Sequence, residues 1–217
     1  MRLNADLSLA AAVDSGTLAW VPSPEAGVER RMLERDGEEV ARATSLVRFA
    51  PGSSFSPHTH GAGEEFLVLD GVFSDESGDF PAGFYLRNPP QSRHRPASVP
   101  GAVIFVKLRQ MPPEEKAPLR LDTRDPALWR DLGGGRQQAQ LFDAPWERVV
   151  MQRLAPGYAG GAESFPRGAE IFLLEGDLEI DGAVHHAGLW LRRPADCTLA
   201  LTSNEGALFY LKSGHLG

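Results

Sequence analysis

Residues 50–71 read APGSSFSPHTHGAGEEFLVLDG, and 105 positions later residues 155–176 read APGYAGGAESFPRGAEIFLLEG. Both segments begin with Ala-Pro-Gly, continue into an apolar run and end on a glycine. The same offset relates residues 82–89 to residues 187–194 without a gap. Because chance does not keep register over such a distance, the chain contains an internal repeat, which has to be recognised before the fold is predicted.

Each repeat contains short apolar runs separated by clusters of glycine, proline, aspartate and serine, which is typical of strands joined by turns. The chain has 23 glycines and 17 prolines, and patterns with a helical period are rare. These features predict an all-β fold built from two small sandwiches or barrels. Residues 178–184 are predicted to form a hairpin whose turn is Asp181-Gly182, and residues 126–132 are the one predicted helix.

The segment between the repeats, residues 111–118, contains three prolines and three charged residues. This composition suits a linker over the surface rather than a strand. We therefore divide the chain into a first domain, residues 1–115, and a second domain, residues 116–217.

The composition excludes several classes of protein. Among 217 residues, 22 are Lys or Arg and 29 are Asp or Glu, so the net charge is −7, and no basic run is present to bind nucleic acid. No apolar stretch is long enough to span a membrane. The single cysteine, Cys197, excludes an internal disulfide and a cysteine-rich zinc finger, and it points to a reducing compartment. We expect a cytoplasmic protein that binds neither nucleic acid nor membranes.

A group of residues that commonly bind metals lies in the first repeat. His58 and His60 immediately precede a predicted strand, where alternation puts both imidazoles on one face. Glu64 follows four residues after His60, and His94 leads into another strand. Three imidazoles and one carboxylate suit iron, manganese, nickel, copper or zinc, and they do not suit calcium or magnesium. These four residues are the predicted ligands of one first-row transition metal ion.

Other candidate residues have simpler interpretations. Glu65 is expected on the face opposite the predicted ligands, although a ligand or supporting role for it stays open. His185 and His186 are adjacent on a strand and point to opposite faces, so a solvated turn is favoured over chelation. Cys197 has no histidine or cation beside it, which favours an unreactive thiol. His215 falls in a tail that is expected to fray.

The spacing of the predicted ligands resembles the first sequence motif of the cupins. The matching residues are Gly52, His58, His60, Glu64 and Gly71. The stretch that contains Gly83, Pro89 and His94 resembles the second cupin motif, with Gln91 in place of a glycine and Ser98 in place of an asparagine. Neither departure removes a ligand, and the longer Gln91 side chain is expected to shape the mouth of the pocket.

Residues 20–110 are also similar to the ChrR-type cupin, the metal-binding half of the ChrR anti-sigma factors. The similarity rests on motifs that include Leu46-Val47-Arg48-Phe49-Ala50-Pro51-Gly52 and Gly83-x-Tyr85-x-Arg87-Asn88-Pro89-Pro90. The resemblance implies two tandem cupin barrels of the double-stranded β-helix, or jelly-roll, type. It also implies one divalent transition metal ion, foremost zinc or iron, with manganese or nickel as alternatives. The family's amino-terminal sigma-binding domain has no counterpart in this sequence, so we do not expect a sigma factor as a partner.

The second repeat lacks the predicted metal site. The offset of 105 residues carries the four ligand positions to Glu163, Phe165, Ala169 and Leu199. One potential ligand is too few to hold a metal ion, so we expect a degenerate, metal-free barrel whose corresponding site is partly filled by Phe165 and Leu199.

Five residues of the first repeat are candidates for a substrate pocket. Phe66 and Val68 would supply an apolar wall, and Gln91 would lie at the mouth. Tyr85 and Arg87 could line the pocket, with Arg87 orienting an anionic ligand. A packed tyrosine and a salt bridge at the rim explain the latter pair equally well.

Two functions from different classes agree with these features. The first is a regulatory protein that senses a ligand or redox state through its metal, as the resemblance to ChrR implies. The second is a non-haem metal-dependent dioxygenase or isomerase for a small diketone or phenolic substrate, because four protein ligands leave two positions on an octahedral ion. The sequence favours the first and leaves catalysis open. Either function implies a small-molecule ligand, and both a homodimer and a monomer are compatible with the sequence.

Overall fold

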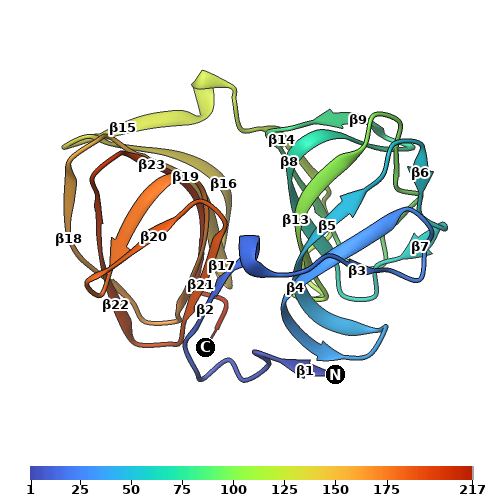
Figure 1. Cartoon of the computed structure of the whole chain (residues 1–217), viewed down its shortest axis with the longest axis horizontal. Coiled ribbons are helices and arrows are strands. Elements are labelled where there is room, and N and C mark those ends of the chain that lie inside the picture. Colours follow the sequence, from blue (N-terminus) through green and yellow to red (C-terminus); the bar gives the residue numbers. More distant parts are fainter. Residues whose placement is uncertain (217) are drawn as a thin grey trace. The chain divides into compact units, whose positions relative to one another are not determined.

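The computed structural model describes residues 1–216 and confirms the all-β prediction. Helix among these residues is limited to two short 3-10 turns, η1 (Ser15–Thr17) and η2 (Pro126–Leu128). The chain forms two compact units (Figure 1). Unit 1 contains residues 1–5 and 18–124, and unit 2 contains residues 6–17 and the chain from Asp125 onward.

Unit 1 is an antiparallel barrel around a long sheet with the strand order β1-β4-β5-β13-β8-β10-β14. Its strands are β1 (Arg2–Leu3), β3 (Val21–Pro22), β4 (Val28–Gly37), β5 (Ala41–Phe49), β6 (Ser53–Ser54), β7 (His58–Thr59), β8 (Glu64–Asp75), β9 (Gly78–Pro81), β10 (Phe84–Asn88), β11 (Arg93–His94), β12 (Ala97–Ser98), β13 (Ala102–Leu108) and β14 (Leu119–Asp122). The short strands β7 and β11 pair with each other in a separate two-stranded ladder.

Unit 2 has the corresponding strand order β15-β16-β17-β23-β19-β21-β2. Its strands are β2 (Ala11–Asp14), β15 (Trp129–Gly133), β16 (Arg136–Ala144), β17 (Glu147–Leu154), β18 (Tyr158–Phe165), β19 (Ala169–Ile180), β20 (Ala183–His186), β21 (Leu189–Arg193), β22 (Cys197–Ser203) and β23 (Ala207–Ser213). The strands β8, β9, β10 and β13 recur 105 residues later as β19, β20, β21 and β23 with the same bounds. The sequence repeat is therefore also a structural repeat.

Two short strands belong to a unit other than the one expected from a division at residue 115. β2 pairs with β21 in unit 2, and β14 pairs with β10 in unit 1. Each strand covers an edge that would otherwise expose unpaired backbone groups. The second unit therefore resumes at Asp125, after β14, and not at residue 116 as the composition of residues 111–118 suggests.

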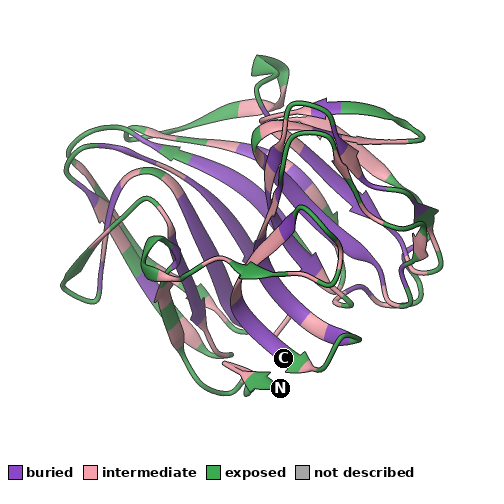
Figure 2. Cartoon of the chain, turned by 45° about the vertical axis from the view of Figure 1, so that its right-hand side comes forward, coloured by how far each residue is buried: buried purple, intermediate pink, exposed green. Residues whose placement is uncertain are grey.

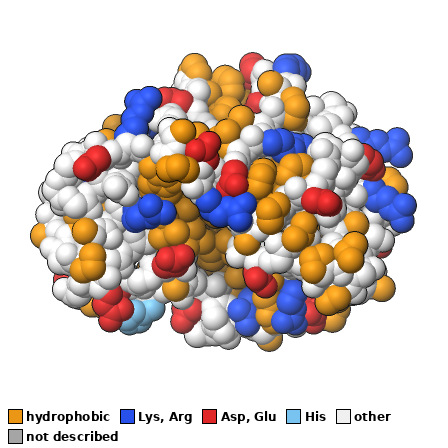
Figure 3. Space-filling model, turned by 90° about the horizontal axis from the view of Figure 1, so that it is seen from above, with side chains coloured by type: hydrophobic (Ala, Val, Ile, Leu, Met, Phe, Trp, Pro, Cys, Tyr) orange, Lys and Arg blue, Asp and Glu red, His pale blue; other side chains and the backbone are white. Residues whose placement is uncertain are grey.

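Each unit surrounds its own apolar core, which appears in Figure 2 as the buried stretches of the long strands. Equivalent positions of the two longest strands supply Phe66, Val68 and Phe73 from β8 and Ile171, Leu173 and Leu178 from β19. On the face seen in Figure 3, Lys and Arg side chains are interspersed with Asp and Glu side chains and apolar groups. None of the helices among residues 1–216 has the length and apolar character needed to cross a membrane.

The predicted Asp-Gly hairpin is present between β19 and β20. Ile180 pairs with Ala183, and the turn residues Asp181 and Gly182 have φ angles of 54° and 78°. Two successive left-handed residues are the geometry that a two-residue hairpin turn requires.

The predicted helix over residues 126–132 is wrong. The 3-10 turn η2 is capped by the Asp125 carboxylate, which accepts a hydrogen bond from the Ala127 amide. The chain then enters β15, which forms a hairpin with β16, and glycines 133–135 make the turn between them. The cross-strand pairing overrides the weak local helix preference of so short a segment.

Gly71 and Gly52 offer a comparison between two left-handed glycines, with φ angles of 70° and 75°. A Cβ on Gly71 would overlap the carbonyl oxygen of Gly101, whereas a Cβ on Gly52 would meet nothing within 4 Å. We expect Gly71→Ala to lower the free energy of unfolding by about 3 kcal/mol, and Gly52→Ala by about 1 kcal/mol from its backbone conformation alone. Urea unfolding of both variants measures the difference, and equal losses would contradict the close approach at Gly71.

Candidate metal centre

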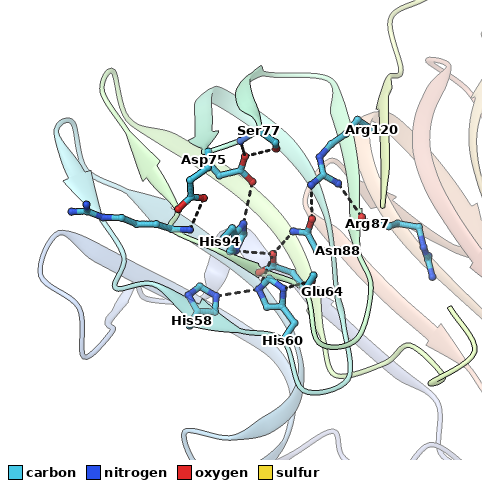
Figure 4. A network of polar contacts seen from close by, with 12 residues as sticks. His58, His60, Glu64, Asp75, Ser77, Arg87, Asn88, His94 and Arg120 are labelled. Atoms are coloured by element: carbon cyan, nitrogen blue, oxygen red, sulfur yellow. Dashed lines mark hydrogen bonds and ion pairs between the residues drawn. The ribbon is translucent and has the colours of Figure 1, made fainter. Parts of the chain in front are cut away.

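The four predicted metal ligands converge at one end of the unit 1 barrel (Figure 4). The ladder between β7 and β11 places His58 directly opposite His94. His60 follows β7 and is held in place because its amide donates to the carbonyl of Ser92 at 2.9 Å. Glu64 opens β8 beside them. One donor atom from each of the four residues lies within 4.8 Å of the others.

Hydrogen bonds orient all three imidazoles. The Nδ1 atom of His58 lies 3.0 Å from the carbonyl oxygen of Ser56, and that of His94 lies 3.1 Å from Oδ2 of Asp75. A carbonyl and a carboxylate can only accept, so both rings carry their proton on Nδ1 and, when neutral, direct an Nε2 lone pair at the centre. The Nδ1 atom of His60 contacts Oγ of Ser92 at 3.0 Å.

The Glu64 carboxylate completes the ring of donors. Its Oε2 atom lies 3.4 Å from Nε2 of both His60 and His94. Asn88, buried on the neighbouring strand β10, donates from Nδ2 to the same oxygen at 2.9 Å, and Arg120 donates to Oδ1 of Asn88 at 2.7 Å. Asn88 therefore holds Glu64 in position, and Arg120 holds Asn88.

This donor set fits a metal ion. Nε2 of His94 is buried and has no hydrogen-bond partner among residues 1–216. Nε2 of His58 and Nε2 of His60 face each other at 3.1 Å. Buried lone pairs directed at one another and at a carboxylate are unfavourable unless a proton or a cation lies between them. Three imidazole nitrogens and one carboxylate oxygen are donors suited to first-row transition metals.

The histidines differ in their acid–base behaviour. Burial is the largest effect on His60 and lowers its pKa. Burial also opposes protonation of His94, but the hydrogen bond to Asp75 and the charge of Glu64 outweigh it, so the pKa of His94 is raised. Although burial would raise the pKa of Asp75, hydrogen bonds from His94 and Ser77 lower it to about 2. Asp75 is therefore an anion near neutral pH, as its role as the acceptor of the His94 proton requires.

Asp75 is expected to be important for metal binding without contacting the metal. We expect Asp75→Asn to weaken metal affinity by about 10- to 100-fold, because a carboxylate behind a ligating histidine fixes its tautomer and raises its basicity. Competition with a chromophoric chelator measures this change. Asp79→Asn alters an exposed carboxylate two residues beyond the turn and serves as the control. Equal affinities for the two variants would argue against this role of Asp75.

The structure separates the predicted pocket residues. Of the five, only Gln91 is among the described residues that line a cleft of about 500 Å³ beside the centre. Gln91 has a φ angle of 69°, and its Nε2 donates to the carbonyl of Gly61 at 3.2 Å. Phe66 and Val68 share a face with Glu64, but they are buried in the core of unit 1.

Tyr85 and Arg87 do not line the cleft, which was one of the two roles left open for them. Arg87 pairs directly opposite Glu65 in the ladder between β10 and β8, and this face of the sheet is turned away from the face with Glu64. The Arg87 guanidinium is fully buried and contacts Glu65 at 3.1 Å and Glu115 at 2.6 Å. The Tyr85 hydroxyl donates to Glu65 at 2.8 Å. The packed tyrosine and salt bridge left open above describe this pair better, although the ion pair is buried and does not lie at the rim.

The equivalent positions of unit 2 are occupied by other contacts. Leu199 is buried in the apolar core of that unit, Phe165 packs against it, and Ala169 opens β19. Glu163 forms an ion pair with Arg136. The core side chains thus fill the region where unit 1 has its metal ligands.

Four remaining sequence candidates lie in unit 2. His186 and His185 occupy successive positions of β20, opposite Asp177 and Leu178, and therefore point to different faces. Burial raises the pKa of the Cys197 thiol, which disfavours a reactive thiolate. The tail containing His215 does not fray as expected, since Nε2 of His215 lies 3.2 Å from Oε2 of the buried Glu170.

Sequence reasoning missed the residues that support the ligands, namely Asp75, Asn88, Ser92 and Arg120. Asn88 lies inside the second motif, where its position directly before Pro89 was a usable signal. Asp75 and Arg120 come from distant segments and carry no motif of their own.

Comparisons with known proteins agree with this description. The family model of the ChrR cupin-like domain matches residues 9–112. No curated protein matches the sequence. Among solved structures, a Nostoc punctiforme protein described as a candidate dioxygenase matches with a TM-score of 0.77 and 16% identity, covering 96% of this chain and 84% of that one.

Two further structures have the same fold. The Escherichia coli pirin YhhW in complex with nickel(II) has a TM-score of 0.71 and 11% identity, covering 94% of this chain and 98% of its own. Salicylate 1,2-dioxygenase from Pseudoaminobacter salicylatoxidans has a TM-score of 0.69 and 14% identity, covering 95% of this chain and 81% of its own. At these identities the similarity shows the fold alone. With the family match over residues 9–112 it supports the cupin fold, and the two large sheets are consistent with two tandem barrels.

Proposed function

We propose that the protein is a metal-dependent oxygenase that holds one divalent first-row transition ion, foremost iron, on His58, His60, Glu64 and His94. The observation that carries this proposal is the convergence of three oriented imidazoles and one carboxylate on one point, beside a cleft whose lining includes His94. The substrate is a small phenolic or diketone compound with two neighbouring oxygen atoms.

Whether four protein ligands make a structural or a reactive site depends on the metal ion that they hold. Structural zinc sites are typically closed by four protein ligands in a tetrahedron. On an ion that prefers six ligands, His58, His60, Glu64 and His94 would leave two positions for other ligands, and a redox-active ion held there would supply one-electron chemistry with dioxygen and would polarise substrate oxygens. A cleft of about 500 Å³ beside the ligands is large enough for a small aromatic molecule.

The protein's own residues would keep the site ordered and dry. Asp75 holds the His94 ring through Nδ1, and Asn88 holds Glu64 through one oxygen. Phe73 packs 6.0 Å from the His94 ring and 4.6 Å from Phe66, measured between ring centroids. This apolar floor excludes water from the side of the site that faces the core, so exchange is directed through the cleft.

The structural comparisons support the proposal, since one similar structure is described as a dioxygenase and another as a candidate dioxygenase. The match of residues 9–112 to the ChrR cupin-like domain favours a second function, a regulatory protein whose metal senses a ligand or redox state. Under that function we expect bound zinc and no turnover of any substrate.

Metal analysis followed by oxygen uptake separates the two functions. Protein purified without added metal is analysed for metal content, reconstituted anaerobically with Fe(II), and then assayed for oxygen consumption with a panel of diketones, catechols and hydroxylated benzoates. Uptake that depends on both substrate and Fe(II), and that is absent in His94→Ala, supports the oxygenase. One equivalent of zinc with no uptake on any compound would exclude it in favour of the sensor.

A further inference from the structure

The cleft beside the metal centre is lined by an excess of positive side chains. Arg93, Lys116 and Arg120 line it together with the acidic residues Asp75 and Glu76. The whole chain carries a net charge of −7, and on the face shown in Figure 3 the two signs are interspersed. The charge of a divalent ion at the neighbouring centre would be larger than the single negative charge of Glu64, so metal binding would make the cleft more positive.

The two acidic side chains of the cleft are already engaged. Asp75 accepts hydrogen bonds from His94 and from Ser77. Glu76 accepts one from the backbone amide of Arg95 at 3.0 Å. Asp75 pairs with His94, and neither Asp75 nor Glu76 forms an ion pair with Arg93, Lys116 or Arg120 among residues 1–216. The charges of Asp75 and Glu64 act on Arg120 from a distance, but none of the three cations is directly paired with a carboxylate of the lining.

Arg120 is held rigidly by neutral acceptors. Its Nη1 donates to the carbonyls of Arg87 at 3.0 Å and Leu119 at 2.8 Å, and its Nη2 donates to Asn88 at 2.7 Å. No carboxylate neutralises it directly, and Nη2 keeps a second N–H. A guanidinium fixed in this way is preorganised to receive a carboxylate, which it binds in a planar geometry.

Two further cations are available at the cleft. Lys116 and Arg93 are exposed, and neither has an ion-pair or hydrogen-bond partner among residues 1–216. The walls between the cations include Pro89, Pro90 and Pro118, which offer flat apolar surface. The lining thus combines positive charge with apolar walls, as a small aromatic or aliphatic acid requires.

We propose that this cleft selects small molecules that carry a carboxylate, and that Arg120, assisted by Lys116, binds this group while the oxygen donors of the molecule reach the metal position. The Asn88 side chain bridges the Arg120 guanidinium and the Glu64 carboxylate, so the carboxylate-binding position and the metal position lie one side chain apart. This inference deepens the proposed function and rests on the metal centre, but its binding step requires neither turnover nor a redox-active metal.

Calorimetric titration of zinc-loaded protein tests the inference. The probes are catechol, 2,3-dihydroxybenzoate and 3,4-dihydroxybenzoate, which share a chelating pair of hydroxyls and differ in the carboxylate. We expect at least one dihydroxybenzoate to bind about tenfold more tightly than catechol, as one charge-assisted contact allows. In Arg120→Gln the ratio of dihydroxybenzoate affinity to catechol affinity should fall to about one, and in Lys116→Gln this ratio should fall about threefold.

Arg130→Gln, which removes an exposed cation in unit 2, should bind all three probes as the wild type does. Equal affinity of the wild type for catechol and both acids overturns the inference, as does an undiminished preference in Arg120→Gln. If Arg120→Gln loses zinc, the variants Lys116→Gln and Arg93→Gln are used in its place. An undiminished preference for the dihydroxybenzoates in both of them overturns the inference. Carboxylate preference without oxygen uptake by the Fe(II) form would refute the oxygenase and leave this inference standing.

Discussion

Replacing His94 by alanine is expected to abolish stoichiometric metal binding. Nε2 of His94 is buried, has no hydrogen-bond partner among residues 1–216 and is aimed at the other donors by Asp75. The substitution removes one of the four ligands. It also removes the imidazole that donates a hydrogen bond to Asp75. Metal content after purification, and again after reconstitution and desalting, measures the effect. His58→Ala removes the ligand opposite and should give the same result.

His185→Ala is the matched control, because His185 is a partly exposed histidine on a strand of unit 2. It should retain metal at the level of the wild type. If His185→Ala loses metal while His94→Ala keeps it, the assignment of the centre to unit 1 is wrong. Thermal unfolding with and without metal provides a second readout, since a ligand that binds only the native state raises its stability.

The second large effect is expected from Arg87→Met. Arg87 is fully buried between Glu65 and Glu115, so the substitution removes the cation that these two buried carboxylates share. We expect the free energy of unfolding to fall by about 3 to 5 kcal/mol, as happens when one partner of a buried ion pair is removed. Urea unfolding with an unchanged denaturant slope measures this loss.

Two further variants test the cause of that loss. Arg124→Met breaks the exposed pair with Asp122, and its unfolding midpoint should match that of the wild type. The triple variant Arg87→Met, Glu65→Gln and Glu115→Gln removes the buried charges together and should recover most of the stability. A stable Arg87→Met, or a triple variant as weak as the single one, would show that charge burial is not the cause.

The sequence predicted the ligand group better than the pocket. The ligands lie within two short segments. The β7–β11 ladder joins these segments and places His94 directly opposite His58, so both side chains lie on the same face. The role of Tyr85 and Arg87 stayed open, because alternation along one strand does not give its register with the neighbouring strand. Once Arg87 is known to lie opposite Glu65, the two share a face, and that face is not the face of Glu64.

A β-bulge explains why Asp75 was missed. Counted by alternation from Glu64, residue 75 falls on the opposite face of β8. The ladder between β8 and β13 shifts register between Val103 and Ile104, whose partners are Asp70 and Val68. The extra residue reverses the alternation, so Asp75 returns to the face of the ligands and reaches His94.

The sequence by itself determined the two-fold repeat, the all-β class and the residue types that gather around the candidate metal. These properties follow from periodicity and spacing, which are local and read directly along the chain. Only the tertiary structure decided which side chains support the ligands, which cations line the cleft and which unit receives β2 and β14. These depend on register, on a bulge and on pairing between strands far apart in sequence, and such long-range backbone hydrogen bonds leave no local pattern from which they could be inferred.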